Sequence, residues 1–211
     1  VGTVTGVTCM PRYQYQPFEV SPPLELTERS IAPTMYPVAI IGAGPIGLDA
    51  AIDLATKGIP SVVLDDNNVV SVGSRAICWA KRTLEIFDRL GVGERMLRKG
   101  VTWQTGRLFH KDSEVYNFDL LPEDGHKFPA FINLQQYYVE QYLVERAREF
   151  PELIDLRFKN SVHAHKDLGE YVELSVETPF GVYELKAEYI LACDGAGSPT
   201  RKRMDLPFEG Q

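Results

Sequence analysis

The chain has 211 residues, 44% of them hydrophobic, and a formal net charge of −7, which is the composition of a folded globular protein. The negative charge argues against nucleic acid or an anionic membrane surface as the main partner, and no apolar run approaches the roughly 20 residues of a membrane span. Cys9, Cys78 and Cys193 are far apart, the histidines show no metal-ligand spacing and no secretory signal is present, so we expect reduced thiols, no metal site and a cytoplasmic protein.

Residues 1–36 contain five prolines and show no sustained hydrophobic period. This pattern predicts an extended N-terminal arm. Because the arm carries Tyr13, Tyr15 and Phe18, we expect it to pack on the domain or on a neighbouring subunit.

The next segment has the pattern of a strand, a glycine turn and a helix. Residues 38–41 are apolar and mostly β-branched, which is typical of a strand buried on both faces. Gly42, Gly44 and Gly47 follow in G-x-G-x-x-G spacing. The first glycine allows a tight turn, the second lets the backbone approach a pyrophosphate, and the third lets the helix lie close to the strand.

The helix that follows begins with Pro45 and Ile46 and is expected to end at Gly58. Its N-terminus offers free N–H groups and a positive dipole end to phosphates. A second apolar strand, 61–64, leads to Asp65 and Asp66, where a carboxylate can accept hydrogen bonds from a ribose diol. The two acids would repel a 2′-phosphate, so the pattern favours FAD or NAD over NADP.

Further along the chain, the apolar spacing of residues 74–90 predicts a helix that ends at Gly91. Arg75 then lies at a helix start, which is unfavourable for a cation unless an anion is near, so we interpret it as a phosphate contact. Residues 101–118 alternate loosely and predict strands with turns, followed by a loop at 119–129.

A third helix is predicted over 133–150, with Asn133 as its cap and its apolar face formed by Val139, Leu143 and Ala147. Three strands are expected to follow as an antiparallel meander, joined by turns at 167–169 and 179–181. These strands are 155–163, 171–178 and 182–187. His163 and His165, at the end of the first strand and just after it, share one face of a probable strand, which we interpret as solvated.

A last apolar run, 188–193, ends in Asp194 and Gly195. An Asp at the end of a parallel strand lies at the carboxyl edge of the sheet, where open α/β folds bind ligands. The same dipeptide is also a common turn, so the residues alone leave a plain strand exit open.

Four segments, taken in order, resemble one family. They are GAGPIG (42–47), SRAICWAKRTLEIFDRLG (74–91), QYYVE (136–140) and CDGAGSPTR (193–201). The chain looks like the N-terminal part of the flavin-dependent aromatic hydroxylases, the para-hydroxybenzoate hydroxylase and phenol hydroxylase group. Its closest likeness is to 3-(3-hydroxyphenyl)propionate hydroxylase-type enzymes.

The resemblance implies how the residues are used. Gly42, Gly44 and Gly47, with Pro45 and Ile46 between them, would hold the FAD pyrophosphate. Asp65 and Asp66 would lie at the adenosine ribose. Arg75 would reach the phosphate region, and Gln136, or the adjacent Gln135, would lie near the flavin chain. Asp194 and Gly195 match a motif linked in the family to both FAD and nicotinamide binding.

The implied fold is α/β: a three-layer, Rossmann-like FAD-binding fold with a mainly parallel sheet and an antiparallel β-meander. It would occupy 37–208, with substrate-side β elements near 101–132. The family's second FAD motif, a G-D pair, and its substrate domain are not found in this sequence. We therefore expect an incomplete fold and the N-terminal portion of a longer enzyme, which exposes apolar surface and needs its C-terminal half or a second copy.

The implied activity is hydroxylation of a phenolic compound with NADH or NADPH and O2, and no catalytic residue is identified. An NAD-dependent dehydrogenase is one alternative, although no second run of alternating helices and parallel strands follows Asp65. A non-catalytic dinucleotide-binding fragment or subunit that needs a partner chain is the other.

Overall fold

The computed structural model describes residues 13–27, 35–73 and 75–210. Cys9, Ser74 and parts of the predicted arm lie outside the described residues. The helices and strands are, in chain order, α1 (Leu24–Thr27), β1 (Met35–Ile41), α2 (Pro45–Thr56), β2 (Ser61–Asp65), β3 (Cys78–Ala80), α3 (Lys81–Arg89), α4 (Gly93–Lys99), β4 (Val101–Thr102), β5 (Thr105–His110), β6 (Ser113–Asp119), β7 (Phe131–Asn133), α5 (Gln136–Ala147), β8 (Ile154–Phe158), β9 (Ser161–Asp167), β10 (Val172–Thr178), β11 (Gly181–Ala192) and α6 (Pro199–Arg203).

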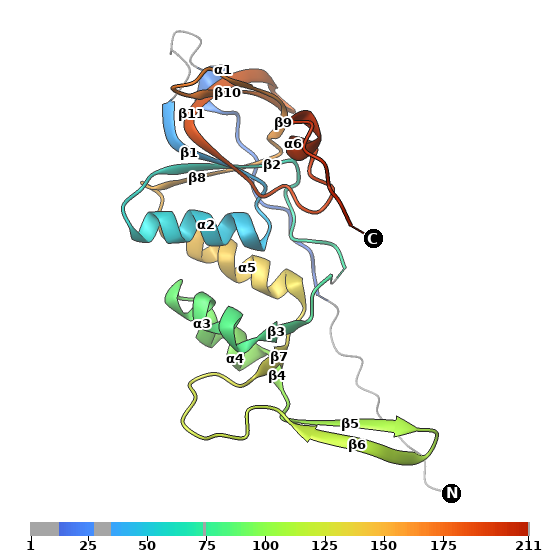
Figure 1. The fold of residues 1–211 in the computed structure, drawn as a ribbon. Helices are drawn as coiled ribbons and strands as arrows, with labels where there is room; N and C mark the ends of the chain where they lie inside the picture. Colours follow the sequence, from blue (N-terminus) through green and yellow to red (C-terminus); the bar gives the residue numbers. More distant parts are fainter. Residues whose placement is uncertain (1–12, 28–34, 74, 211) are drawn as a thin grey trace, which may run out of the picture.

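A six-stranded sheet with the order β8-β2-β1-β11-β10-β9 organises the fold (Figure 1). Strands β8, β2, β1 and the second half of β11 are parallel, whereas β9, β10 and the first half of β11 form the antiparallel meander. Strand β11 joins two strands that the sequence pattern separates at residue 187. Its early residues pair with β10 and its later residues with β1, so one strand passes from the meander into the parallel sheet.

The sheet separates two apolar cores. Helices α2 and α5 pack on one face, where Leu48, Ile52 and Leu143 are fully buried. On the other face the meander covers β1 and β2, and Leu174 and Leu185 are fully buried there. These layers confirm the predicted three-layer α/β fold with a mainly parallel sheet.

Two helix starts differ from the prediction. The helix expected from residue 74 begins only at Lys81, because residues 78–80 form β3 and pair antiparallel with β7. Trp79 is buried in this strand, and its indole N–H donates to the carbonyl of Leu134 at 2.7 Å. For the same reason Asn133 is not a helix cap: it is the last residue of β7, and α5 begins after Gln135.

The expected strand 155–163 is in fact two strands on opposite edges of the sheet. Strand β8 pairs in parallel with β2, and β9 pairs with β10. The break falls at Lys159, which has a φ of +57°, followed by buried Asn160. In β9, His163 is exposed beside Glu177, whereas Nδ1 of His165 is buried, so only His163 fits the solvated interpretation.

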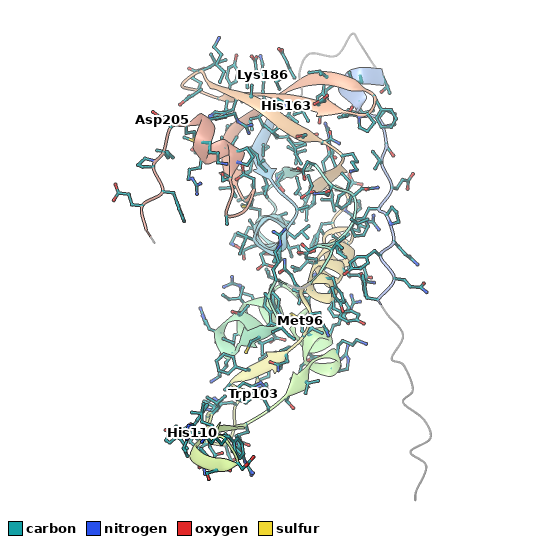
Figure 2. All side chains as sticks on the ribbon, turned by 90° about the vertical axis from the view of Figure 1, so that its right-hand side faces the viewer. Met96, Trp103, His110, His163, Lys186 and Asp205 are labelled. Atoms are coloured by element: carbon teal, nitrogen blue, oxygen red, sulfur yellow. The ribbon has the colours of Figure 1, made fainter. Side chains whose placement is uncertain are left out.

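Residues 101–132 lie in the lower part of the molecule, where Phe128 and Ile132 join the core packed against α2 and α5. Strands β3, β7 and β4 make a small sheet beside α3 and α4, and β5 and β6 make a hairpin that projects away from it. Figure 2 shows His110 of this hairpin at the end of the molecule opposite to His163 and Lys186. The strands predicted over 101–118 are confirmed, and α4 is an element that the sequence pattern did not predict.

None of the helices within 13–27, 35–73 and 75–210 has the length and apolar character needed to span a membrane. In the same ranges, no three His, Cys, Asp or Glu side chains are grouped so that they could hold a metal ion.

Asp49 of α2 is a partly buried acid with one carboxylate oxygen that lacks a hydrogen-bond partner among the described residues. This oxygen, Oδ1, is itself buried. Burial, and secondarily the charge of Asp53, raises the pKa of Asp49 to about 7. In the unfolded chain the pKa of Asp49 has its ordinary value of 3.8. Protonated Asp49 therefore adds to the stability of the fold at low pH, and this contribution is lost as the pH rises through the raised pKa of about 7.

We therefore expect Asp49→Ala to raise the free energy of unfolding at pH 8 by about 1–2 kcal/mol, since it removes a buried, unpaired carboxylate. At pH 5 the gain should shrink. Urea denaturation at both pH values measures this. Asp53→Ala is the control, because Asp53 pairs with Lys57 and Arg89 and its loss should not stabilise the protein. An equal effect of Asp49→Ala at both pH values would contradict the assignment.

Candidate functional site

An open cleft with a volume of about 400 Å³ lies at the carboxyl ends of β1, β2 and β11. This is the edge where open α/β sheets bind ligands. Every site residue predicted from the sequence except Gly47 lines the cleft. These residues are Gly42, Gly44, Pro45, Ile46, Asp65, Asp66, Arg75, Gln136, Asp194 and Gly195.

Gly42 and Gly47 make a close approach between backbones possible. Gly42 has a φ of +104°, and a Cβ built on it would lie 2.5 Å from the carbonyl oxygen of Cys193. A Cβ on Gly47 would lie 1.9 Å from the carbonyl oxygen of Gly42. The first glycine therefore brings the turn against the end of β11, and the second brings α2 against the turn, as the G-x-G-x-x-G spacing predicts.

Gly44 differs, because a Cβ built on it meets no atom within 4 Å. Gly44 is the residue before α2, and no side chain caps this helix end. The first-turn N–H groups of the 12-residue helix are thus not covered by a capping side chain, and Ile46 in that turn is 70% exposed. An open backbone at a helix N-terminus suits a phosphate group.

Asp65 ends β2 and holds the glycine turn. Its Oδ2 accepts a hydrogen bond from the N–H of Ala43 at 2.6 Å, and its Oδ1 accepts one from the N–H of Asn67 at 2.8 Å. Burial raises the pKa of Asp65, and these two hydrogen bonds oppose the rise. The carboxylate already has backbone partners, and each oxygen can accept a further hydrogen bond. Asp66, next to it, accepts from the side chain of Asn67.

Two cationic side chains line the cleft: Arg75, on the segment after β2, and Arg203, on α6. The prediction that Arg75 opens a helix is wrong, because α3 begins at Lys81. The argument from the helix dipole therefore does not apply to it. What remains is its position: Arg75 is exposed on the cleft wall, where a cation can meet an anionic ligand.

Asp194 and Gly195 form the turn after β11. Oδ1 of Asp194 accepts from Oγ of Ser198 at 2.6 Å, and Oδ2 accepts from the N–H of Thr200 at 2.9 Å. Burial alone would raise the pKa of Asp194, but these hydrogen bonds hold it below its usual range. Asp194 therefore shapes the entry to α6, and Gly195, with a φ of +83°, completes the turn.

Glu140 is a cleft residue that was not singled out from the sequence. It is 3% exposed and accepts hydrogen bonds from the N–H and Oγ of Ser71 and from Nε2 of Gln136. Gln136 lies one helical turn before it and lines the same cleft, whereas Gln135 precedes the helix. The i, i+4 spacing of Gln136 and Glu140 was the available signal, since such a pair shares one helix face.

Glu140→Ala should lower the free energy of unfolding by about 2–3 kcal/mol, because buried donors lose a charged acceptor. It should also weaken ligand binding, because Ser71 and Gln136 both line the cleft. Denaturant melts and ligand titrations of the purified variant measure the two effects. Glu145→Ala, which removes a half-buried carboxylate paired with Arg95 on the same helix but outside the cleft, is the control. A Glu140→Ala protein of unchanged stability would show that the hydrogen bonds of this carboxylate do not stabilise the fold.

Comparison with known proteins gives a family match over residues 35–211, described as FAD binding domain. The para-nitrophenol 4-monooxygenase of Pseudomonas sp. (strain WBC-3) is 28% identical over 180 residues, which cover 84% of this chain and 44% of the relative. A 3-(3-hydroxy-phenyl)propionate/3-hydroxycinnamic acid hydroxylase of Escherichia coli O157:H7 (strain EC4115 / EHEC) is 30% identical over 179 residues, covering 82% of this chain and 31% of the relative.

Among solved structures, p-nitrophenol 4-monooxygenase PnpA from Pseudomonas putida DLL-E4 has a TM-score of 0.79 and 28% sequence identity, over 85% of this chain and 46% of that chain. The chain thus spans less than half of the length of these relatives.

Proposed function

The chain belongs to the FAD binding domain family, and we propose that it is the cofactor-binding part of a flavin-dependent monooxygenase that hydroxylates a phenolic compound. The observation that carries this proposal is the cleft, in which the open backbone at Gly44, the carboxylate of Asp65 and the cation of Arg75 face one space. We place the FAD-binding domain at residues 37–208.

The residues of the cleft fit an FAD molecule in a definite order. The pyrophosphate would lie against the uncapped N-terminus of α2, where Gly44 leaves space for it. The adenosine ribose would lie at Asp65, which keeps lone pairs for the ribose hydroxyls. Arg75 would neutralise phosphate charge, and Gln136, held by Glu140, would lie along the chain that leads to the flavin.

Bound FAD would supply the redox chemistry, taking hydride from NADH or NADPH and activating O2 for transfer of one oxygen to the ring. The cleft residues of this chain bind and orient the cofactor. The acids at Asp65 and Asp66 lie where a 2′-phosphate would be repelled, which favours FAD over NADP at this site. No residue is proposed as a catalytic base.

Exposed apolar surface supports a larger assembly. In the β5–β6 hairpin Leu108, Phe109, Val115 and Tyr116 are each more than half exposed. The later residues of β11 pair with β1 on one side but have no strand partner on the other among the described residues. We propose that the remainder of a longer protein, or a second copy, covers these surfaces, and that the chain alone does not hydroxylate a substrate.

The alternative of an NAD-dependent dehydrogenase is less well supported. After β2 the chain forms the lower part and then the meander, so the sheet continues with antiparallel β10 and β9. A second parallel nucleotide-binding half is not formed within 66–73 and 75–210. The other alternative is that the chain is a non-catalytic dinucleotide-binding fragment. The NADH and NADPH oxidation assay distinguishes such a fragment from a self-sufficient enzyme.

The experiment titrates the purified chain with FAD, ADP, NAD⁺ and NADP⁺, and then follows NADH and NADPH oxidation with phenol present. We expect binding of FAD and ADP, weaker binding of NAD⁺ and the weakest of NADP⁺, with no hydroxylated product. Preferential binding of NAD⁺ together with oxidation of an alcohol substrate would contradict the proposal and support the dehydrogenase.

Binding of ADP or FAD should depend on pH through Asp65. The pKa of Asp65 lies above 3.8 before binding, and ribose hydroxyls donate stronger hydrogen bonds to the ionised carboxylate than to the protonated acid. Affinity should therefore fall as the pH is lowered through that raised pKa. Calorimetric titrations of ADP over the acidic range measure this. Asp65→Asn should bind about 10-fold more weakly, the loss of a charged hydrogen bond, and without that pH dependence. If both proteins show the same pH profile, Asp65 does not contact the ribose.

A further inference from the structure

The N-terminal arm is fixed to the loop that borders the cleft. The family match begins at residue 35, so the described arm residues lie outside it. The N–H of Phe18 donates to the carbonyl of Asn68 at 2.6 Å, and Nδ2 of Asn68 donates to the carbonyl of Phe18 at 3.2 Å. Nearby, the N–H of Gly73 donates to the hydroxyl of Tyr15 at 3.1 Å. The arm thus contacts the loop 66–73 near both of its ends.

Contacts on either side of these hydrogen bonds fix the arm itself. Upstream, the hydroxyl of Tyr13 donates to Oε1 of Gln141 in α5 at 3.0 Å. Downstream, Glu25 of α1 forms a salt bridge of 3.1 Å with Arg157 of β8, and the two side chains are 5% and 10% exposed. An ion pair of that burial restricts the backbone around it, so the segment between Tyr13 and Glu25 is held against the domain at both ends.

The loop 66–73 is itself part of the cofactor wall. It begins directly after Asp65 and leads to Arg75, and its Ser71 is hydrogen-bonded to Glu140. A second cavity of about 340 Å³ lies beneath it and shares Gly44, Asp65 and Arg75 with the main cleft. Phe18 lines that cavity together with Phe158, and the two rings stack with 4.5 Å between their centroids. Displacing Phe18 would therefore remove part of the cavity wall and the segment that is hydrogen-bonded to Asn68 of the loop.

We propose that Tyr15 and Phe18 are positioning residues for the cofactor: they hold the loop 66–73 and through it set the affinity for the ADP half of FAD. The inference rests on the proposed function, because it assigns the loop to the FAD site. Neither residue is expected to touch the flavin. The arm would thus be an addition to the family domain that contributes to cofactor binding.

The test compares the 211-residue chain with Phe18→Ala, Phe18→Leu and Tyr15→Phe, and with Phe109→Ala as a control for loss of an exposed aromatic ring in the distant hairpin. ADP affinity is measured by calorimetry and FAD affinity by flavin fluorescence, at a temperature where circular dichroism shows every variant folded. Phe18→Ala should weaken ADP and FAD binding about 5- to 10-fold and by the same factor, the scale of a lost aromatic contact. Phe18→Leu should recover most of the affinity.

Tyr15→Phe removes one hydroxyl without changing shape, and should weaken ADP binding about two- to fivefold, the scale of one hydrogen bond. If Phe18→Ala does not fold, the ADP affinity of Tyr15→Phe tests the proposal in its place. Variants that melt at a lower temperature but bind ADP as the wild type does would overturn the inference and leave the arm a structural role. If the wild-type chain binds neither ADP nor FAD, the proposed function itself fails, which is a different result.

Discussion

Gly47→Ala is expected to lower the free energy of unfolding by about 3 kcal/mol, because the new methyl group would lie 1.9 Å from the carbonyl oxygen of Gly42. That atom belongs to the backbone of the turn between β1 and α2, so no side chain can move aside to relieve the contact. Either α2 moves away from the sheet or the turn is rebuilt, and both disturb the core around Leu48 and Ile52, which are fully buried.

Denaturant unfolding of the purified variant measures the loss, with Gly44→Ala as the matched control three residues earlier in the same turn. A Gly47→Ala protein as stable as the wild type would show that α2 does not need the close approach seen here.

Gly44→Ala should have the opposite profile: a folded protein that no longer holds its cofactor. Gly44 has a φ of −72°, which alanine adopts freely, and its Cβ would enter open space, so the cost at this helix cap is at most about 1 kcal/mol. The methyl group would occupy the space in which we place the pyrophosphate. We expect FAD and ADP affinity to fall roughly 10- to 100-fold, the range of an overpacked contact.

Flavin fluorescence and calorimetry give the affinities, and circular dichroism confirms the fold. Gly58→Ala, just beyond the far end of α2, is a control for a glycine change remote from the cleft, although its φ of +74° makes some loss of stability expected there. Wild-type FAD affinity in Gly44→Ala would mean that the phosphates are placed wrongly.

The glycine turn was predictable from the sequence because its determinants are local. Gly42 and Gly47 are needed by backbone contacts within the βαβ unit or with the neighbouring strand end, and Asp65 follows from the end of β2. The meander turns were predictable for the same reason, since Gly169 and Gly181 have positive φ values that favour glycine.

Other elements depend on distant partners. Trp79 lies in a three-residue strand that exists because β7, more than 50 residues away, pairs with it. Periodicity alone favoured a helix there, and tertiary pairing decided the outcome. The turn between β8 and β9 carries no glycine or proline: Lys159 adopts the left-handed conformation, and Asn160 is held by Phe158 and Tyr183.

The candidate site shows the same division. The residues on the strand ends and on the glycine turn were found, because sheet topology brings them to one edge. Glu140 was not singled out, because a buried acid on an amphipathic helix resembles a surface charge until its partners are known. The contacts of Phe18 with Asn68 join segments that are 50 residues apart in sequence, and no local sequence pattern predicts such a pairing.

The most direct measurement is a crystal structure of the chain with FAD or ADP bound. We predict the pyrophosphate at the N-terminus of α2 beside Gly44, the adenosine ribose on Asp65, and Arg75 within reach of a phosphate oxygen. A nucleotide bound elsewhere, or one bound in the cleft with its ribose turned away from Asp65 and its phosphates away from Gly44, would contradict the central claim.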